Sequence, residues 1–251
     1  MSQITSIGSS IAIGAALVVS AFLVGNSLQK FRNDDRSISV KGFSEREVKA
    51  DLAVWKIKIA LPTNDLIKGN DSLQILKKKV KDFLLAKGME PDEIKSLDYA
   101  VVDKQANEYG EGSDRKLRYL LSENLEVRTA KVDRILEISR LSSELVGAGV
   151  ALSTRADWQG AGLQFFFTQL QSIKPVMISE AIKNAKSAAQ QFAKDSDIGL
   201  GPLRRANQGL FSIEDRDQSF EQGNPNGYGA SVNTGLFKKV RVVISAEYSI
   251  E

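Results

Sequence analysis

The residues that could carry out chemistry in this chain are few, because two of the usual catalytic residue types are missing. The sequence contains no histidine and no cysteine. Histidine is the most common general base and neutral metal ligand, and cysteine supplies thiolate nucleophiles, disulfides and thiolate zinc sites. We therefore predict no catalytic residue, no cofactor and no metal site, and we expect the chain not to be an enzyme.

Three acidic residues come closest to a cation site. Glu214, Asp215 and Asp217 lie close together in the sequence, and carboxylate oxygens are the ligands that Ca²⁺ prefers. Their spacing lacks the remaining ligands of an EF-hand loop, so solvated loop acids are the preferred interpretation.

A ligand-binding surface is the alternative to a non-enzymatic role in assembly. Two polar loops, over residues 105–116 and 214–235, occupy equivalent places in the predicted order of elements. The second is far longer than an ordinary hairpin connection, and loops of this size are either functional or disordered. Tyr109, Arg204 and Tyr228 could line a pocket at these loops, as in a small-ligand-binding module or an uncharacterised hydrolase.

The elements that would position these residues follow from the apolar patterns. Alternation typical of strands occurs over residues 38–42, 53–61, 97–101, 117–127, 152–168, 199–213 and 240–250. Helical spacing occurs over residues 66–83, 131–146 and 175–192. Because the strands alternate and so bury one face, we expect an α+β fold in which helices cover one face of an antiparallel sheet.

The helices carry more specific expectations. Asn64 or Asp65 is expected to cap the first helix. Its predicted core side consists of Leu66, Leu73, Leu76, Val80 and Phe83. Lys77, Lys78 and Lys79 are expected mostly on its solvated side. The apolar positions of the helix over residues 131–146 are Ile135, Ile138, Leu141 and Leu145.

The same patterns predict the domain organisation. The chain divides into an N-terminal anchor or uncleaved signal (1–29), a polar tether (30–37) and one α+β domain (38–251). Within that domain the order strand–helix–strand–loop–strand occurs twice, which predicts two βαββ-like halves. The halves cover about 38–129 and 150–251, and the helix over 131–146 joins them.

The apolar run over residues 4–25 is the feature that bears most on function. No charged side chain occurs from Met1 through Gln29, and the run is long enough for a helix to cross a bilayer. A cleaved signal peptide is the alternative, but the basic n-region is missing and residues 19–21 form only a passable cleavage site. We therefore favour an uncleaved transmembrane helix.

Small residues recur along one face of this predicted helix. Gly8, Ala12, Ala16 and Ser20 fall at every fourth position. Such ridges let two membrane helices approach closely, so these residues are a hypothetical helix-packing surface, although small residues are also common in membrane spans.

The charges that follow the run bear on orientation. Lys30, Arg32 and Arg36 follow it and nothing basic precedes it, so the positive-inside rule favours a cytoplasmic C-terminal domain. The net charge of +3 is evenly mixed along the chain, and no basic stripe indicates nucleic-acid binding.

Three stretches together resemble the SIMPL-domain family, a domain of unknown function that includes periplasmic immunogenic proteins. Residues 38–43 with 51–54 resemble its opening V-x-G…PD-x-A-x-V strand. Residues 181–189, followed by Leu200-Gly201, are similar to its A-x-x-x-A-x-x-x-A helix leading to L-G. Residues 240–250 resemble its closing strand. Ala50 stands where the family usually has proline, and residues 195–198 replace the commoner Ala-Gly approach to Leu-Gly.

The resemblance covers about residues 37–251 and implies a βαββ-type α+β fold and export in bacteria. It also implies self-assembly into large oligomers, as in some members, and provides no catalytic residues. It favours an extracytoplasmic domain, against the flanking basic charges. We therefore expect a single-pass protein of the bacterial inner membrane with a periplasmic C-terminal domain, forming a homo-oligomer or binding an unknown protein partner. Secretion to the periplasm after signal cleavage is the alternative.

Overall fold

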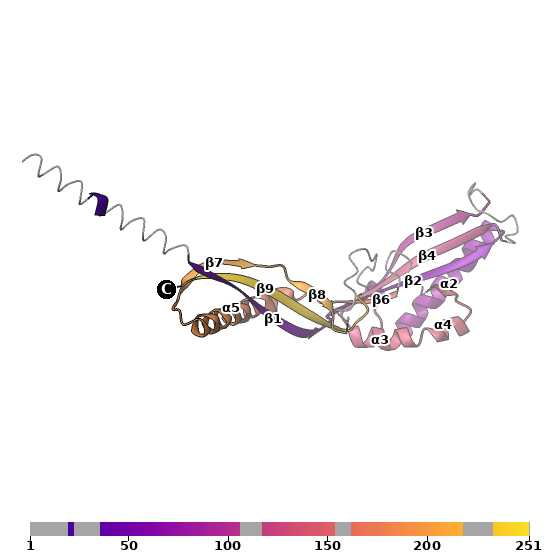
Figure 1. The fold of residues 1–251 in the computed structure, drawn as a ribbon. Coiled ribbons are helices and arrows are strands. Elements are labelled where there is room, and N and C mark those ends of the chain that lie inside the picture. Colours follow the sequence, from indigo (N-terminus) through magenta and orange to yellow (C-terminus); the bar gives the residue numbers. More distant parts are fainter. Residues whose placement is uncertain (1–19, 23–35, 106–116, 154–161, 218–232, 251) are drawn as a thin grey trace, which may run out of the picture. The chain divides into compact units, whose positions relative to one another are not determined.

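The computed structural model of the protein describes residues 20–22, 36–105, 117–153, 162–217 and 233–250. Within these ranges, antiparallel strand pairs and helices form an α+β fold, which confirms the expected fold class (Figure 1). The described residues contain no helix that is both long and apolar enough to cross a membrane. Most of the predicted span over 4–25, including Gly8, Ala12 and Ala16, lies outside them, whereas Ser20 is exposed in a short helical piece over 20–22.

The chain forms two compact units, each assembled from separate parts of the sequence. Unit 1 comprises residues 1–45, 173–211 and 241–251, and unit 2 comprises 46–172 and 212–240. This grouping differs from the sequential halves over 38–129 and 150–251 that the pattern suggested. The reason is that the first and last strands of the domain pair with each other.

Unit 2 contains a five-stranded sheet in the order β3-β4-β2-β5, with β6 also paired to β2. Its strands are β2 (Leu52–Thr63), β3 (Ile94–Asp103), β4 (Tyr119–Thr129), β5 (Leu152–Ser153) and β6 (Gly162–Phe166). The two central strands are antiparallel and pair without a shift from Ala53↔Thr129 to Thr63↔Tyr119. The edge strand β3 pairs with β4, on the other side of β4 from β2.

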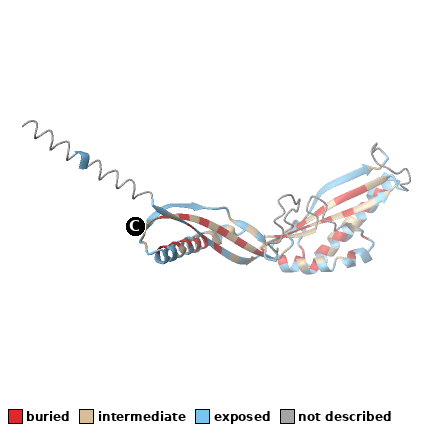
Figure 2. Cartoon of the chain, in the orientation of Figure 1, coloured by how far each residue is buried: buried red, intermediate tan, exposed pale blue. Residues whose placement is uncertain are grey.

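One face of this sheet is covered by α2 (Leu66–Ala86), α3 (Val132–Arg140) and α4 (Ser143–Gly147). The alternating inward residues of β2 and β4 are buried against them in one core, as expected for single-sided strands (Figure 2). The buried core residues include Trp55, Ile57, Ile59, Leu73, Val80, Leu84, Leu121, Leu125, Ile135, Ile138 and Phe165.

Helix α2 begins at the cap that the sequence indicated, and Leu73 and Val80 are buried on its core side as predicted. Asp65 accepts hydrogen bonds from the backbone N–H groups of Ile67 and Lys68 at 3.0 and 3.1 Å. Leu66, expected in the core, is 42% exposed, whereas Gly69 and Leu84 are buried. A Cβ at Gly69 would lie 2.6 Å from Thr63 Cγ2, so glycine allows the first turn to approach β2.

The helix expected over 131–146 is broken into α3 and α4. Leu141 N–H donates to Ile138 O and Ser142 N–H to Ser139 O, and these three-residue spacings tighten the backbone and end α3 at Arg140. Leu141, expected in the core, is 40% exposed because it lies at this break, whereas Leu145 is buried as predicted.

Unit 1 packs helix α5 (Leu170–Asp195) against the strands β1 (Ser37–Lys49), β9 (Phe237–Ile250) and β7 (Leu200–Gln208), which lie in the order β1-β9-β7. The short strand β8 (Ser212–Asp215) also pairs with β9. The helix buries Met177, Ala181, Ala185, Ala189 and Ala193, a residue at every fourth position. The alternation predicted for residues 240–250 is confirmed, since the even-numbered residues 240–248 are buried.

Candidate interaction surface

Strand β3 exposes several large apolar side chains at the edge of the unit 2 sheet. It lies at the edge of the sheet, where β4 is its partner on one side and no other described strand pairs with it. Ile94 is buried, whereas every residue from 95 to 102 is exposed. The apolar side chains among them are 44–49% exposed: Leu97, Tyr99, Val101 and Val102.

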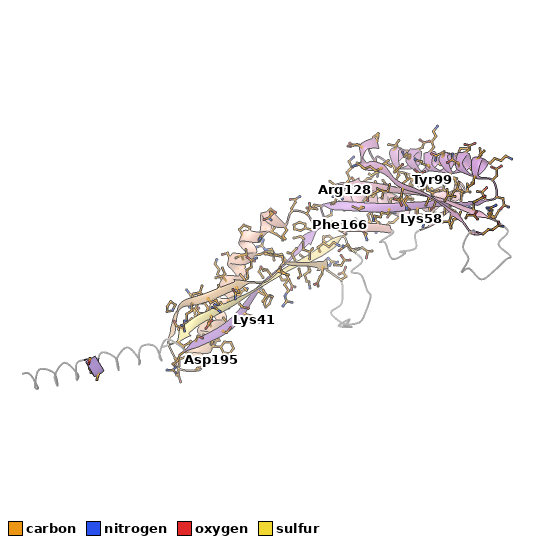
Figure 3. All side chains as sticks on the ribbon, turned by 90° about the horizontal axis from the view of Figure 1, so that it is seen from above. Lys41, Lys58, Tyr99, Arg128, Phe166 and Asp195 are labelled. Carbon is orange, nitrogen blue, oxygen red and sulfur yellow. The ribbon has the colours of Figure 1, made fainter. Side chains whose placement is uncertain are left out.

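Both faces of this edge strand are apolar in its second half. Tyr99 and Val101 pair with Glu123 and Leu121 on the helix-covered face of the sheet. Val102 pairs with Leu120 and lies on the opposite face. Figure 3 marks Tyr99 among the side chains of unit 2. An exposed apolar edge presents unpaired N–H and C=O groups and is a template for adding another strand.

A bulge limits the regular part of this edge. The register of β3 on β4 shifts between Ser96 and Tyr99, so the undisturbed ladder covers residues 99–103. Lys104 N–H donates to Arg118 O at 2.9 Å, which turns the Lys104 backbone toward β4. Because backbone groups alternate along a strand, those of Tyr99 and Val101 point away from β4.

Polar contacts fix the C-terminal end of β3 to its neighbours. Arg118 Nη2 donates to Asp103 Oδ2 at 2.8 Å, and its Nε lies 3.1 Å from the same oxygen. The hydrogen bond with Asp103 raises the pKa of the Arg118 guanidinium. The Arg118 N–H also donates to Asn64 Oδ1 at 2.8 Å. These bonds hold the last residues of the strand in a defined position.

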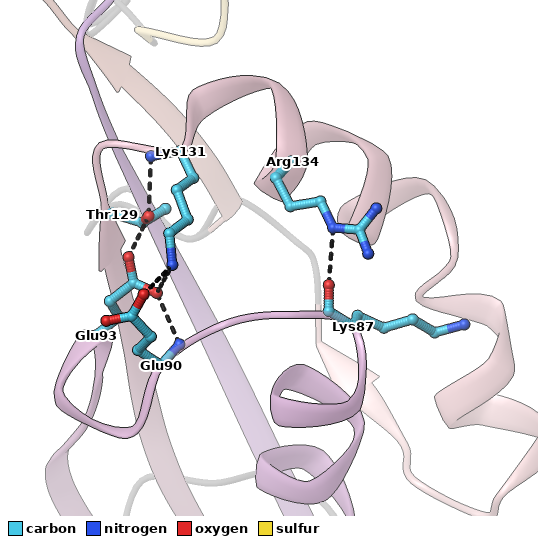
Figure 4. A network of polar contacts seen from close by, with 6 residues as sticks. All are labelled: Lys87, Glu90, Glu93, Thr129, Lys131 and Arg134. Carbon is cyan, nitrogen blue, oxygen red and sulfur yellow. Dashed lines mark hydrogen bonds and ion pairs between the residues drawn. The ribbon is translucent and has the colours of Figure 1, made fainter.

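A second network holds the segment that leads into β3 (Figure 4). Thr129 Oγ1 donates to Glu93 Oε1 at 2.5 Å, and Lys131 Nζ donates to Glu90 Oε1 at 2.5 Å. Burial would raise the pKa of Glu93, but hydrogen bonds from Thr129 and the Glu90 backbone, together with the Lys131 charge, lower it overall. The short 3₁₀ turn η1 (Pro91–Glu93) is thereby joined to β4 and to the start of α3.

Beneath β3, on the helix-covered face, lies a charged pair that the sequence did not indicate. Glu123 occupies an inward position on β4, and its side chain is 5% exposed. Its Oε1 lies 2.5 Å from Lys77 Nζ of α2, and its buried Oε2 has no hydrogen-bond partner in the described part of the chain. The expectation that Lys77 faces solvent is therefore wrong, since its side chain is only 21% exposed.

The acidic residues near the second loop also have structural partners. Asp215 is an acceptor for the buried Lys238 ammonium and for the Gly235 N–H. Asp217 pairs with Arg216 at 2.9 Å. Solvated acids were expected here, but Asp215 is largely buried because Lys238 occupies an inward position on β9. The described ranges contain no group of three or more acidic side chains suited to a metal ion.

Only one of the three residues proposed for a ligand pocket lies within the described structure. Arg204 is exposed on β7 in unit 1, whereas Tyr109 and Tyr228 lie outside the described residues, as does most of each loop. What β3 offers chemically is a row of backbone donors and acceptors bordered by apolar side chains. The alternation over residues 97–101 predicted this strand. Its position at the edge of the sheet depends on the order of the strands, which local sequence patterns do not encode.

Comparison with known proteins places the chain in a family. The family model described as SIMPL, protein of unknown function (DUF541), matches residues 38–248, which is most of the chain. No curated protein matches it. The match covers both units, and it includes Gly42 and the Ala181, Ala185 and Ala189 positions whose close packing forms unit 1. The chain therefore belongs to the SIMPL family.

Proposed function

We propose that this protein is a non-enzymatic, membrane-anchored component of the bacterial cell envelope that acts through self-association or through contact with a protein partner. The observation that carries this proposal is the β3 edge, where exposed apolar side chains lie on a strand that pairs with β4 and with no other described strand. Soluble domains usually protect such edges, because exposed ones pair with other chains.

The anchor part of the proposal is supported by the uncharged segment over residues 1–29. An apolar stretch of this length suits a single transmembrane helix, and the absence of a basic n-region is unlike a cleaved signal peptide. Membrane fractions washed with alkaline carbonate should retain the protein, and its intact mass should include residues 1–29. A soluble protein of lower mass would indicate a cleaved signal instead.

Association is tested on the full-length protein in detergent. Light scattering coupled to size-exclusion chromatography should give a particle mass above that of one 27.5 kDa chain after subtraction of detergent. Crosslinking in intact membranes should capture either a second copy or another protein. A strict monomer at high concentration, together with no crosslinked partner, would contradict the proposal.

Orientation is tested separately from association. The proposal places the C-terminal domain in the periplasm of the bacterial envelope, anchored in the inner membrane. A reporter that is active only after export, fused after Glu251, should therefore be active, and one that is active only in the cytoplasm should not. The reverse result would agree with the basic residues after the apolar run and would overturn the proposed location.

A further inference from the structure

The three long strands of unit 1 have ends that lie together, close in the chain to the predicted anchor. Arg36 O accepts the Ile250 N–H at 3.2 Å, and Leu200 pairs with Ile250. The start of β1, the end of β9 and the start of β7 are therefore at one end of unit 1 (Figure 1). We call this the anchor-side end.

Helix α5 runs antiparallel to β1, so its last turns lie at the same end. Ser44 Oγ donates to Glu180 Oε2 at 2.8 Å, whereas Val40 belongs to one core cluster with Ala189. Nine residues of helix and four residues of strand each span about 13.5 Å, so helix and strand advance together. Phe192, three residues beyond Ala189, is therefore level with the first residues of β1.

Two large apolar side chains are exposed at the anchor-side end. Phe192 is 57% exposed, and Leu203, the fourth residue of β7, is 48% exposed. Leu203 pairs with the buried Tyr248, whose side chain packs toward α5, so Leu203 lies on the same side of the sheet as the helix. An aromatic and an aliphatic side chain thus remain accessible where the domain is nearest to its predicted anchor.

We propose that Phe192 and Leu203 contact the surface of the lipid bilayer that holds the anchor, so that unit 1 docks on the membrane by this end. This inference rests on the anchor part of the proposed function and adds the surface by which the domain meets the bilayer. Six residues separate Gln29 from Arg36, and this stretch spans at most about 25 Å. The anchor-side end is therefore held close to the interface, where aromatic and apolar side chains are favoured.

The charges at this end indicate what kind of contact it is. Arg36 and Lys194 are accompanied by Asp195 and Asp197, so no basic cluster attracts anionic headgroups. Apolar contact should therefore carry the docking, and it should occur on phosphatidylcholine alone and change little with salt. Two side chains bind a bilayer weakly, but the anchor keeps them at a high effective concentration beside it.

Fluorescence quenching by lipids tests the contact, because the natural chain contains no cysteine. Full-length Gln191→Cys protein carries an environment-sensitive dye at an exposed position beside Phe192. In phosphatidylcholine vesicles, lipids with a nitroxide near the headgroup should quench this dye strongly. Val176→Cys is the matched control, because it is also exposed on α5 but lies about 22 Å away along the helix axis. Its dye should be quenched several-fold less.

Substitutions at the two apolar positions test what drives the contact. In the Gln191→Cys background, Phe192→Ser should lower the quenching several-fold, and Leu203→Ser should also lower it, because each removes apolar surface. Phe192→Leu keeps an apolar side chain and should retain most of the quenching. Both positions are exposed, so circular dichroism should show the same fold for all three variants. Adding phosphatidylserine should leave the quenching nearly unchanged, and a strong increase would contradict an apolar contact.

The outcomes separate this inference from the proposed function. Equal quenching at positions 191 and 176, or undiminished quenching in the Phe192→Ser variant, would show that this end does not dock. A blue-shifted dye that the nitroxide lipids do not quench would show that a protein surface covers Phe192 instead. In these cases the anchor stands if carbonate-washed membranes retain the protein, and only the docking is wrong. If the washed membranes release it, both are wrong.

Discussion

The ion pair between Lys77 and Glu123 places two charges beneath the edge of the unit 2 sheet, where water has little access. Glu123 is surrounded by apolar neighbours on its strand, Leu121 and Leu125, and lies opposite Ile59 and Tyr99. A buried carboxylate is tolerated only when a counter-charge and hydrogen bonds offset its lost hydration. Since Oε2 has no partner in the described part of the chain, Glu123 depends strongly on Lys77.

Replacing this lysine should therefore be costly. Lys77→Met should lower the free energy of unfolding by up to about 3 kcal/mol. This value is at the lower end of the range for breaking a buried ion pair, because Lys77 is partly exposed. Urea denaturation followed by the fluorescence of the buried Trp55 measures this cost. Lys78→Met on the exposed side of α2 is the control and should change stability little. The double variant Lys77→Met with Glu123→Met should recover most of the loss. Equal effects of the single and double variants would contradict the pairing.

The contact between Thr129 and Glu93 makes stability depend on pH. The pKa of Glu93 is lowered in the folded protein, so its stabilising contribution is fully present above the ordinary glutamate pKa of about 4.3. That contribution is lost as the pH falls through the lowered pKa that Glu93 has in the folded protein. Thr129→Val should cost about 1–3 kcal/mol of unfolding free energy at pH 7, and the difference from wild type should shrink below about pH 4.

Thr129→Ser keeps the hydroxyl group and serves as the control for this pH effect. Its unfolding free energy should follow that of the wild type from pH 7 to pH 3. A deficit of the Thr129→Val variant that is the same at pH 3 and pH 7 would show that Glu93 ionisation does not contribute.

Among the elements, β1 and α5 approach each other unusually closely. A Cβ at Gly42 would overlap the Ala181 carbonyl oxygen and the Ala185 backbone. Alanine at every fourth position of α5 gives a smooth helix face, and glycine on the strand lets the backbone lie directly against it. Gly42 of β1 and the alanines of α5 therefore form one backbone-to-backbone contact within unit 1.

Gly42→Ala should consequently separate these elements. The added methyl group meets backbone atoms, which cannot rotate away, so a cost of about 1–3 kcal/mol is expected. Hydrogen exchange should become faster in α5 and in residues 38–44 of β1. Gly147→Ala is the matched control, because a Cβ there meets nothing within 4 Å. Unchanged exchange in Gly42→Ala would contradict the close packing.

The elements also show what local sequence patterns can and cannot predict. The alternation of β9 and β2 correctly identified Val242, Ile244 and Trp55 as inward residues, because period-two burial is a local signal. The same reasoning grouped Leu97, Tyr99 and Val101 on one strand face but could not show that the strand lies at an edge. Glu123 and Lys238 were missed because charged residues at inward positions are recognised only once their partners are known.

For the whole molecule, the first residues of β1 meet the last residues of β9. Arg36 O accepts the Ile250 N–H at 3.2 Å, and Ser37 Oγ donates to Glu247 Oε1 at 2.6 Å. These contacts join the first residues of β1 to the last residues of β9. The proposed anchor should therefore contribute to association and not to folding.

A chain that starts at Arg36 tests this separation. Its unfolding free energy should match that of the full-length protein in the same detergent within about 0.5 kcal/mol, because Arg36 and Ser37 already join the start of β1 to β9. Its self-association should be weaker than that of the full-length protein in vesicles, because tethering no longer concentrates the copies. A chain that starts at Glu45 is the control, and it should lose protection of α5 because Val40 and Gly42 are removed. Lower stability of the Arg36 chain would mean that the apolar segment contributes to the fold. That segment would then do more than anchor an independently stable domain at a membrane.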